Sequence, residues 1–213
     1  MSDAVPAESP EHLAANAAHG AARSDAVAAA VLRVVPDGAG LTLLDYGCGP
    51  GHIGLRLVGH FARIIMADVD PAMVEQAAAA AQGLADVDTR VVDLTAQVPA
   101  DLRADVVVSC LAWHHVAHLD VLLDAVAAVA PGGRLVVADM DADGGAYHAD
   151  NPAFAWITGY HRAELVQTVT RHGYADVTVA DLWQGAKWIN QRLTPLSLFL
   201  LQAVIPARPG AGR

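Results

Sequence analysis

The chain has 213 residues, of which 54% are hydrophobic, and a formal net charge of −10. This length fits one α/β domain with a full core. Phosphate binding depends on clusters of Lys and Arg, and the acidic chain shows none, so we expect no nucleic-acid partner. Two cysteines, Cys48 and Cys110, are too few for a disulfide scaffold and suit a reducing compartment. With no recognisable targeting segment and no long apolar run, we expect a cytoplasmic protein that does not engage a membrane.

The first predicted strand, residues 41–45, follows two predicted helices at 11–20 and 24–35 and ends in Asp45. Three closely spaced glycines come next, Gly47, Gly49 and Gly51. Glycine adopts positive φ without strain and allows a ligand to approach the backbone. The carboxyl end of the first strand of an α/β sheet is where nucleoside cofactors bind. The turn therefore predicts a nucleoside site.

The glycine turn also contains a dinucleotide-type GxGxxG pattern that begins at Gly49, which alone is a weak signal. A pyrophosphate needs free backbone N–H groups and is repelled by a nearby anion. Pro50 removes one such donor, and Asp45 places a carboxylate at the mouth of the loop. The turn therefore favours a cationic ligand without phosphate, such as S-adenosylmethionine.

Two further predicted strands also end in acids. Residues 62–68 end at Asp68, at about the distance that places a carboxylate on ribose hydroxyls in either cofactor class. Asp70 and Pro71 then resemble the N-cap and first position of a helix over 71–82. A third strand ends at Asp93, which is suited to accept a hydrogen bond from an adenine amino group.

The remaining elements alternate along the chain, which predicts a doubly wound parallel sheet. Helices are expected near 52–59, 119–130 and 161–172, and strands near 105–110, 134–139, 176–182 and 196–205. Gly173 is a plausible C-terminal cap for the helix before it.

The chain resembles the class I, Rossmann-like S-adenosylmethionine-dependent methyltransferases of small-molecule type. The resemblance rests on LLDYGCGPG at 43–51, ADVDPAM at 67–73, Asp93, the fourth strand with its His-His continuation, and PGGRLVVAD at 131–139. It implies a seven-stranded, mostly parallel sheet whose last strand is antiparallel beside the fifth. It further implies one domain, with a helical lid at 1–36, a cofactor-binding core at 41–139, acceptor-side segments at 140–195 and the last strand at 196–205.

The same resemblance implies the residues that surround the cofactor. Asp45 and the glycine backbone would lie near the methionine moiety, Asp68 would bind the ribose, and Asp93 with Leu94 would lie by the adenine. The full implied set is Asp45, Gly47, Cys48, Gly49, Gly51, Asp68, Val69, Met73, Asp93, Leu94, Cys110 and Leu111.

Aromatic residues are concentrated late in the chain. Before residue 113 there are only Tyr46 and Phe61, whereas seven lie between 147 and 188: Tyr147, Phe154, Trp156, Tyr160, Tyr174, Trp183 and Trp188. In this fold those segments cover the acceptor side, so the group favours an apolar cleft for a small aromatic or apolar acceptor. Each one singly is better explained by packing of helices onto the sheet.

Histidines are the candidates for a general base, since removal of the acceptor's proton by imidazole would assist transfer. His114 and His115 follow the fourth strand, and His148 lies in the loop that leaves the fifth. Their alternative roles are structural, or in a solvated loop. With His118, the first two suggest a metal site, but the ligand shell is incomplete and no metal is expected.

The expected activity is methyl transfer from S-adenosylmethionine to an O, N or S nucleophile of a small molecule, by a monomer or homodimer. Within the same fold, a protein or RNA acceptor is an alternative that the acidic charge disfavours. The shifted glycine pattern leaves an NAD(P)-dependent oxidoreductase as a further alternative, opposed by Asp45, Pro50 and the lack of a Tyr-x-x-x-Lys pair. A cofactor-binding regulator without catalysis stays open.

Overall fold

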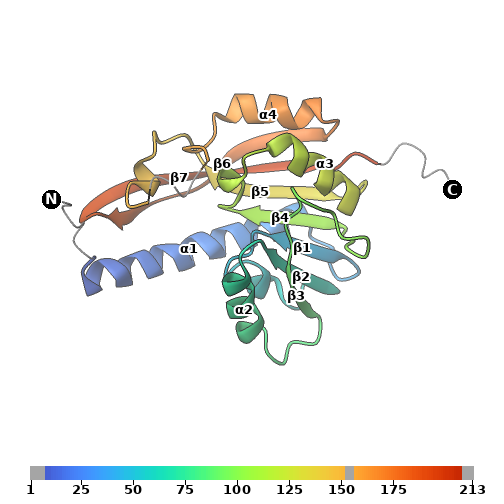
Figure 1. Ribbon diagram of the computed structural model, residues 1–213, viewed down its shortest axis with the longest axis horizontal. Helices are drawn as coiled ribbons and strands as arrows, with labels where there is room; N and C mark the ends of the chain where they lie inside the picture. The colour runs from blue at the N-terminus through green and yellow to red at the C-terminus, as the bar shows by residue number, and fades with distance from the viewer. Residues whose placement is uncertain (1–7, 152–155, 208–213) are drawn as a thin grey trace.

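The computed structural model describes residues 8–151 and 156–207, which form a seven-stranded sheet flanked by helices (Figure 1). The sheet has the order β3-β2-β1-β4-β5-β7-β6. Its strands are β1 (Thr42–Tyr46), β2 (Arg63–Asp68), β3 (Val87–Val91), β4 (Val106–Cys110), β5 (Arg134–Met140), β6 (Ala175–Ile189) and β7 (Arg192–Val204). The helices are α1 (Pro10–Val34), α2 (Pro71–Ala80), α3 (Leu119–Val129) and α4 (Arg162–Arg171).

Strands β1 to β5 are parallel, and β7 inserts antiparallel between β5 and β6. The fold class implied by the resemblance is therefore confirmed. Because the five parallel strands end at one edge, the loops after β1, β2, β4 and β5 meet there (Figure 1). The candidate site lies at this edge.

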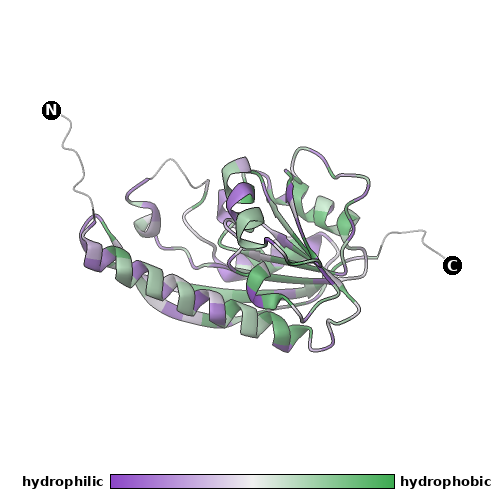
Figure 2. Ribbon diagram, turned by 90° about the horizontal axis from the view of Figure 1, so that it is seen from below, coloured by the Kyte–Doolittle hydropathy of each residue, from purple (hydrophilic) through white to green (hydrophobic). Residues whose placement is uncertain are grey.

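The core has two layers, one on each face of the sheet. Alternate residues of β1 point to opposite faces, so that Leu43 packs with α1 and α2 whereas Leu44 packs with α3 and α4. Strands β1, β2, β4 and β5 are mostly hydrophobic along their length, as burial on both faces of the sheet requires (Figure 2). None of the helices described is long and apolar enough to cross a bilayer.

The N-terminal helices differ from expectation, because α1 is one continuous helix from Pro10 to Val34. The residues between the two predicted helices are good helix formers, and the Gly20 carbonyl accepts a hydrogen bond from Ser24 Oγ at 2.9 Å. No stop signal therefore interrupts it. The helix predicted near 52–59 was wrong in extent: the structure has only a 3-10 turn at Gly54–Leu57.

The last two strands are also longer than predicted. The strands expected near 176–182 and at 196–205 were too short, because β6 and β7 form a long hairpin that takes up residues 175–189 and 192–204 and so occupies much of the segment 140–195. Its turn residues, Asn190 and Gln191, have φ of 50° and 64°, the pattern of a tight hairpin turn. Trp183 and Trp188 consequently lie on a strand and not in a covering loop.

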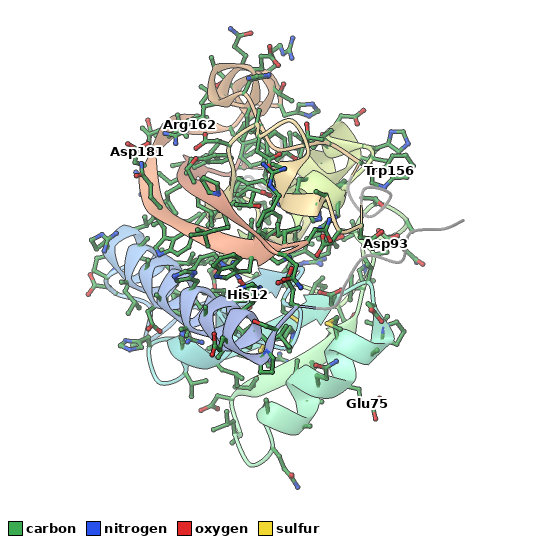
Figure 3. All side chains as sticks on the ribbon, turned by 90° about the vertical axis from the view of Figure 1, so that its left-hand side faces the viewer. His12, Glu75, Asp93, Trp156, Arg162 and Asp181 are labelled. Carbon is green, nitrogen blue, oxygen red and sulfur yellow. The ribbon has the colours of Figure 1, made fainter. Side chains whose placement is uncertain are left out.

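Helix α1 is fastened along the outer strand β6. Asn16 Nδ2 donates to the Trp188 carbonyl at 3.0 Å, and the Trp188 amide donates to Asn16 Oδ1 at 2.7 Å. His12 stacks on the Trp188 ring with centroids 3.7 Å apart (Figure 3). These bonds use the backbone groups that an edge strand leaves unpaired.

Candidate cofactor and acceptor site

The glycine turn after β1 has the backbone conformation that the sequence predicts. Gly47, Gly49 and Gly51 have φ of 74°, 53° and 89°. A Cβ at Gly47 would collide with the Cβ of Ala112 in the loop after β4. Glycine is thus required there both by φ and by close approach of the neighbouring loop.

Asp45 is a fully buried carboxylate at the base of this turn. Its Oδ2 accepts a hydrogen bond from the Gly54 amide at 2.9 Å, whereas Oδ1 has no partner within the described parts of the chain. Burial raises the pKa of Asp45 to about 7, against the effect of the Gly54 bond, and the charge of Asp68 raises the pKa further. Buried polar atoms are normally hydrogen-bonded, so this oxygen can accept a hydrogen bond from a ligand.

Asp68 joins the loop after β2 to the glycine turn. Its Oδ2 accepts from the Gly49 amide at 2.8 Å, and its Oδ1 accepts from the Asp70 amide at 3.0 Å. Asp70 in turn caps α2 by accepting from the Ala72 amide, as the sequence predicts. Val69 is 56% exposed at the same edge, and Met73 is half-buried on the first turn of α2.

The loop after β3 places Asp93 and Leu94 beside β1. Asp93 Oδ1 accepts from both the amide and the hydroxyl of Thr95, and the Leu94 amide donates to the Tyr46 hydroxyl at 3.2 Å. Burial raises the pKa of Tyr46 to about 12, so the hydroxyl keeps its proton. Sequence reasoning did not assign Tyr46 this positioning role. Its place within the glycine motif was the available signal.

The two thiols lie on the face of the sheet that packs against α1 and α2. Cys48 is buried, Cys110 is half-buried, and neither is in a disulfide. Burial raises the pKa of the Cys110 thiol to about 12 and that of Cys48 higher still. These are packing thiols and not nucleophiles. Leu111, directly after Cys110, has a φ of 53°, a strained conformation at the carboxyl end of β4.

Three of the predicted histidines come together at the ends of β4 and β5. His114 Nε2 lies 3.0 Å from His148 Nε2, and the His114 and His115 ring centroids are 4.0 Å apart. One ligand atom from each ring lies within 4.8 Å of the other two. Burial lowers the pKa of His148, and the neighbouring His114 and Lys187 lower it further. The structure thus joins residues 34 positions apart into one histidine cluster, made of His114, His115 and His148.

Asp139 binds the His114 ring of the histidine cluster and was missed as a site residue. It is fully buried, and its Oδ1 accepts from His114 Nδ1 at 2.7 Å and from the Met140 amide at 2.7 Å. Its Oδ2 accepts from the amides of Trp113 and His114 at 3.1 and 3.3 Å. The available signal was that Asp139, like Asp45 and Asp68, lies near the carboxyl end of a strand.

His118 and His161 do not join the histidine cluster. They occupy the positions before α3 and α4, respectively, and His118 is absent from the group whose nitrogens converge. The prediction that His161 begins a helix is confirmed, and the grouping of His118 with His114 and His115 was wrong. Arg162, the first residue of α4, binds Asp141 and Asp181, each at 2.6 Å, which ties α4 to β5 and β6 (Figure 3).

The late aromatic residues divide between core and site. Tyr160 and Tyr174 are buried in the core, whereas Trp156 is 71% exposed. Tyr147 and Trp183 pack with Leu111 around a small apolar group that also contains Met140, Leu196 and Leu198. Phe154 lies outside the described residues.

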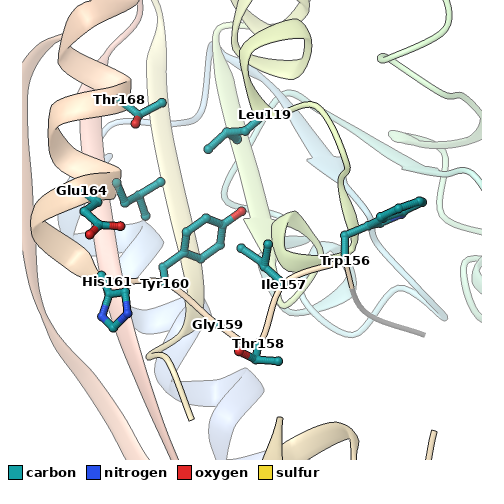
Figure 4. Close-up of a pocket in the computed structure, with 10 residues that line it drawn as sticks. Leu119, Trp156, Ile157, Thr158, Gly159, Tyr160, His161, Glu164 and Thr168 are labelled. Carbon is teal, nitrogen blue, oxygen red and sulfur yellow. The ribbon is translucent and has the colours of Figure 1, made fainter. Parts of the chain in front are cut away.

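A cavity of about 520 Å³ lies between α3, α4 and residues 156–161, lined by Leu119, Tyr160, Glu164 and Thr168 among others (Figure 4). None of the predicted cofactor residues lines it. Two of its lining residues contact the histidine cluster through the backbone, because the Trp156 and Ile157 amides donate to the His114 carbonyl at 3.1 and 3.2 Å.

Comparisons with known proteins agree with this architecture. The curated relatives include an uncharacterized methyltransferase of Schizosaccharomyces pombe, 26% identical over 168 residues, and a ubiquinone biosynthesis O-methyltransferase of Brucella ovis, 35% identical over 104 residues. The matches cover 71% and 48% of this chain, and 54% and 42% of those proteins. The chain thus spans about half the length of these relatives.

Among solved structures, the YcgJ protein of Bacillus subtilis has the same fold, with a TM-score of 0.70 at 17% identity. The superposition covers 86% of this chain and 99% of that one. Residues 19–179, most of the chain, match the family described as "Methyltransferase domain". The chain therefore belongs to this family of methyltransferase domains.

Proposed function

We propose that this protein transfers a methyl group from S-adenosylmethionine to an O, N or S nucleophile of a small aromatic or apolar molecule. The observation that carries the proposal is the unpartnered Oδ1 of Asp45, a buried acceptor beneath a glycine turn. An ammonium group placed there would satisfy this oxygen and keep the carboxylate ionised. The same pocket would repel a pyrophosphate, which argues against a dinucleotide.

The neighbouring residues fit the rest of such a cofactor. Asp68 already accepts two backbone bonds, yet each carboxylate oxygen has a second lone pair that can accept from a ribose hydroxyl. Asp93 and the Leu94 backbone would lie by the adenine. The remaining proposed contacts come from Gly47, Cys48, Gly49, Gly51, Val69, Met73, Cys110 and Leu111.

When bound, the cofactor supplies a methyl group already activated by a sulfonium. The chain's own residues then have to hold the acceptor in line with that group and exclude water, which can lower the barrier by several kcal/mol, roughly 7 or more in favourable cases. Leu111, at the end of β4, and the histidine cluster occupy the edge where the acceptor would approach. We infer that the cluster provides for loss of the acceptor's proton.

The proposal of a small acceptor rests on the apolar group around Leu111, Tyr147 and Trp183 and on the net charge of −10. Apolar and aromatic walls suit a flat or greasy molecule, whereas an acidic surface does not attract nucleic acid. The O-methyltransferase among the relatives supports the same class of acceptor, within the 104 residues that match.

Two measurements test the proposal. Calorimetry is expected to show S-adenosylhomocysteine binding and no NADH binding, whereas NADH binding without a response to S-adenosylhomocysteine would overturn it. A screen of phenols, thiols and amines with labelled cofactor is expected to find a methylated small molecule. Transfer of label only to protein or RNA would contradict the proposed acceptor class.

A further inference from the structure

The histidine cluster has the spacing of a metal site. In a tetrahedral site with metal–nitrogen bonds of about 2.0–2.1 Å, two ligand nitrogens lie about 3.3 Å apart. His114 Nε2 and His148 Nε2 are 3.0 Å apart, and one nitrogen from each of the three rings lies within 4.8 Å of the other two.

The hydrogen bonds of Asp139 orient His114 for coordination. Both carboxylate oxygens already accept from backbone amides, so the proton between Asp139 and His114 belongs to Nδ1 of the ring. In the neutral tautomer with this proton on Nδ1, the lone pair is on Nε2, the atom that lies 3.0 Å from His148 Nε2. A carboxylate behind one ligand histidine is the arrangement that fixes tautomer and ring orientation in metal sites.

Burial also suits a bound ion. His114 is fully buried and His148 is 9% exposed, while His115 is half-buried. Three histidines close only part of a tetrahedral shell and leave one position for an exogenous ligand, as in catalytic and not structural zinc sites. Imidazole ligands favour zinc and its neighbours among the divalent transition metals over magnesium or calcium.

We propose that His114, His115 and His148 bind one divalent transition-metal ion, with Asp139 as the positioning residue, and that the open position takes an ionisable hydroxyl or thiol of the methyl acceptor. The role toward the acceptor rests on the proposed methyltransferase function. The metal site itself does not, because its geometry involves none of the cofactor residues.

The proposed step balances without an oxidant or reductant. On coordination the acceptor's O–H or S–H bond breaks, and the proton passes to solvent. The acceptor's oxygen or sulfur then forms a bond to the methyl carbon as the bond between that carbon and the sulfonium breaks. The electron pair of the broken bond stays on the sulfur of the departing thioether. A metal lowers the pKa of a bound hydroxyl in this manner, and an amine acceptor would gain nothing from it.

Metal binding is tested directly with the full chain, first stripped with a chelator. Titration with Zn²⁺ is expected to show one equivalent bound, and Co²⁺ to give the visible absorption of a tetrahedral site. His115→Ala and His148→Ala are each expected to weaken Zn²⁺ binding at least 30-fold. His118→Ala, which alters a nearby histidine outside the cluster, is the matched control and should leave binding unchanged.

Asp139→Asn is expected to weaken Zn²⁺ binding 10- to 100-fold, as loss of such a supporting carboxylate does elsewhere. Because Asp139 is buried and His115 is only half-buried, His115→Ala serves as the variant that tests the site with the least disturbance to the core. Absence of stoichiometric Zn²⁺ and Co²⁺ binding in the wild type, or binding unaffected by both cluster variants, would overturn the inference. S-adenosylhomocysteine binding measured in parallel separates this failure from failure of the proposed function.

Discussion

Asp68 Oδ2 accepts a hydrogen bond from the Gly49 amide at 2.8 Å, so the acid after β2 fastens the glycine turn after β1. The expected ribose ligand thus also shapes the loop on which the cofactor would rest. The proposed binding role of Asp68 would thus be combined with preorganisation of the loop in one carboxylate.

Asp68→Ala is expected to weaken S-adenosylhomocysteine binding at least tenfold. The variant removes the proposed ribose acceptor and also frees the Gly49 amide. Calorimetry measures the loss. Asp101→Ala is the control, because the Asp101 side chain is 72% exposed and pairs only with Arg90 among the described residues. Equal affinity in wild type and Asp68→Ala would contradict the assignment.

Asp45 makes the stability of the ligand-free protein depend on pH. Its pKa is raised to about 7 when folded, so between about pH 4 and 7 the folded state binds a proton that the unfolded state has lost. Stability therefore falls as pH rises through this range, by up to about 4 kcal/mol. Asp45→Asn should lose this dependence and melt higher than wild type at pH 8. Superimposable pH profiles of the two proteins would refute the assignment.

Cofactor binding is expected to depend on pH in the opposite sense. An ammonium at Asp45 Oδ1 requires the ionised carboxylate, which the ligand-free protein holds only above about pH 7. S-adenosylhomocysteine affinity should fall about tenfold for each pH unit below this value. Asp45→Asn should bind at least tenfold more weakly at pH 8 and show a flat profile. A wild-type affinity independent of pH between 5 and 8 would contradict the ammonium contact.

Gly47→Ala is expected to abolish cofactor binding and to destabilise the fold by a few kcal/mol, roughly 2 or more. The new methyl group would collide with Ala112 and force a positive φ on alanine. Gly83→Ala is the control, since Gly83 also has positive φ, of 86°, but nothing lies near its Cβ position. The difference between the two melting temperatures isolates the collision, and equal losses would show that φ alone matters.

His148→Ala and His115→Ala are expected to reduce turnover at least 100-fold while leaving S-adenosylhomocysteine affinity within twofold. The histidine cluster lies in the segments that follow β4 and β5, whereas the glycine turn follows β1. His161→Ala, before α4, is the control for loss of an imidazole elsewhere. If both cluster variants keep full turnover, methyl transfer depends on positioning alone.

Local signals in the sequence predicted the conformation of the glycine turn and the start of α2 well. Asp70 and Pro71 start α2 as expected, and the positive φ of Gly47, Gly49 and Gly51 follows from their spacing after a short strand. Such features depend on neighbours within a few residues. The extents of α1, β6 and β7 were harder, because strand length in a hairpin and helix continuity depend on packing against distant elements.

By itself the sequence determined the sheet class, the glycine turn and the acids at Asp45, Asp68 and Asp93, since periodicity and turn chemistry are local properties of a chain. Only the tertiary structure decided that His148 joins His114 and His115, that Asp139 supports them, and that one oxygen of Asp45 stays unpartnered among the described residues. These contacts form where parallel strands end side by side, so they depend on which strands are neighbours in the sheet.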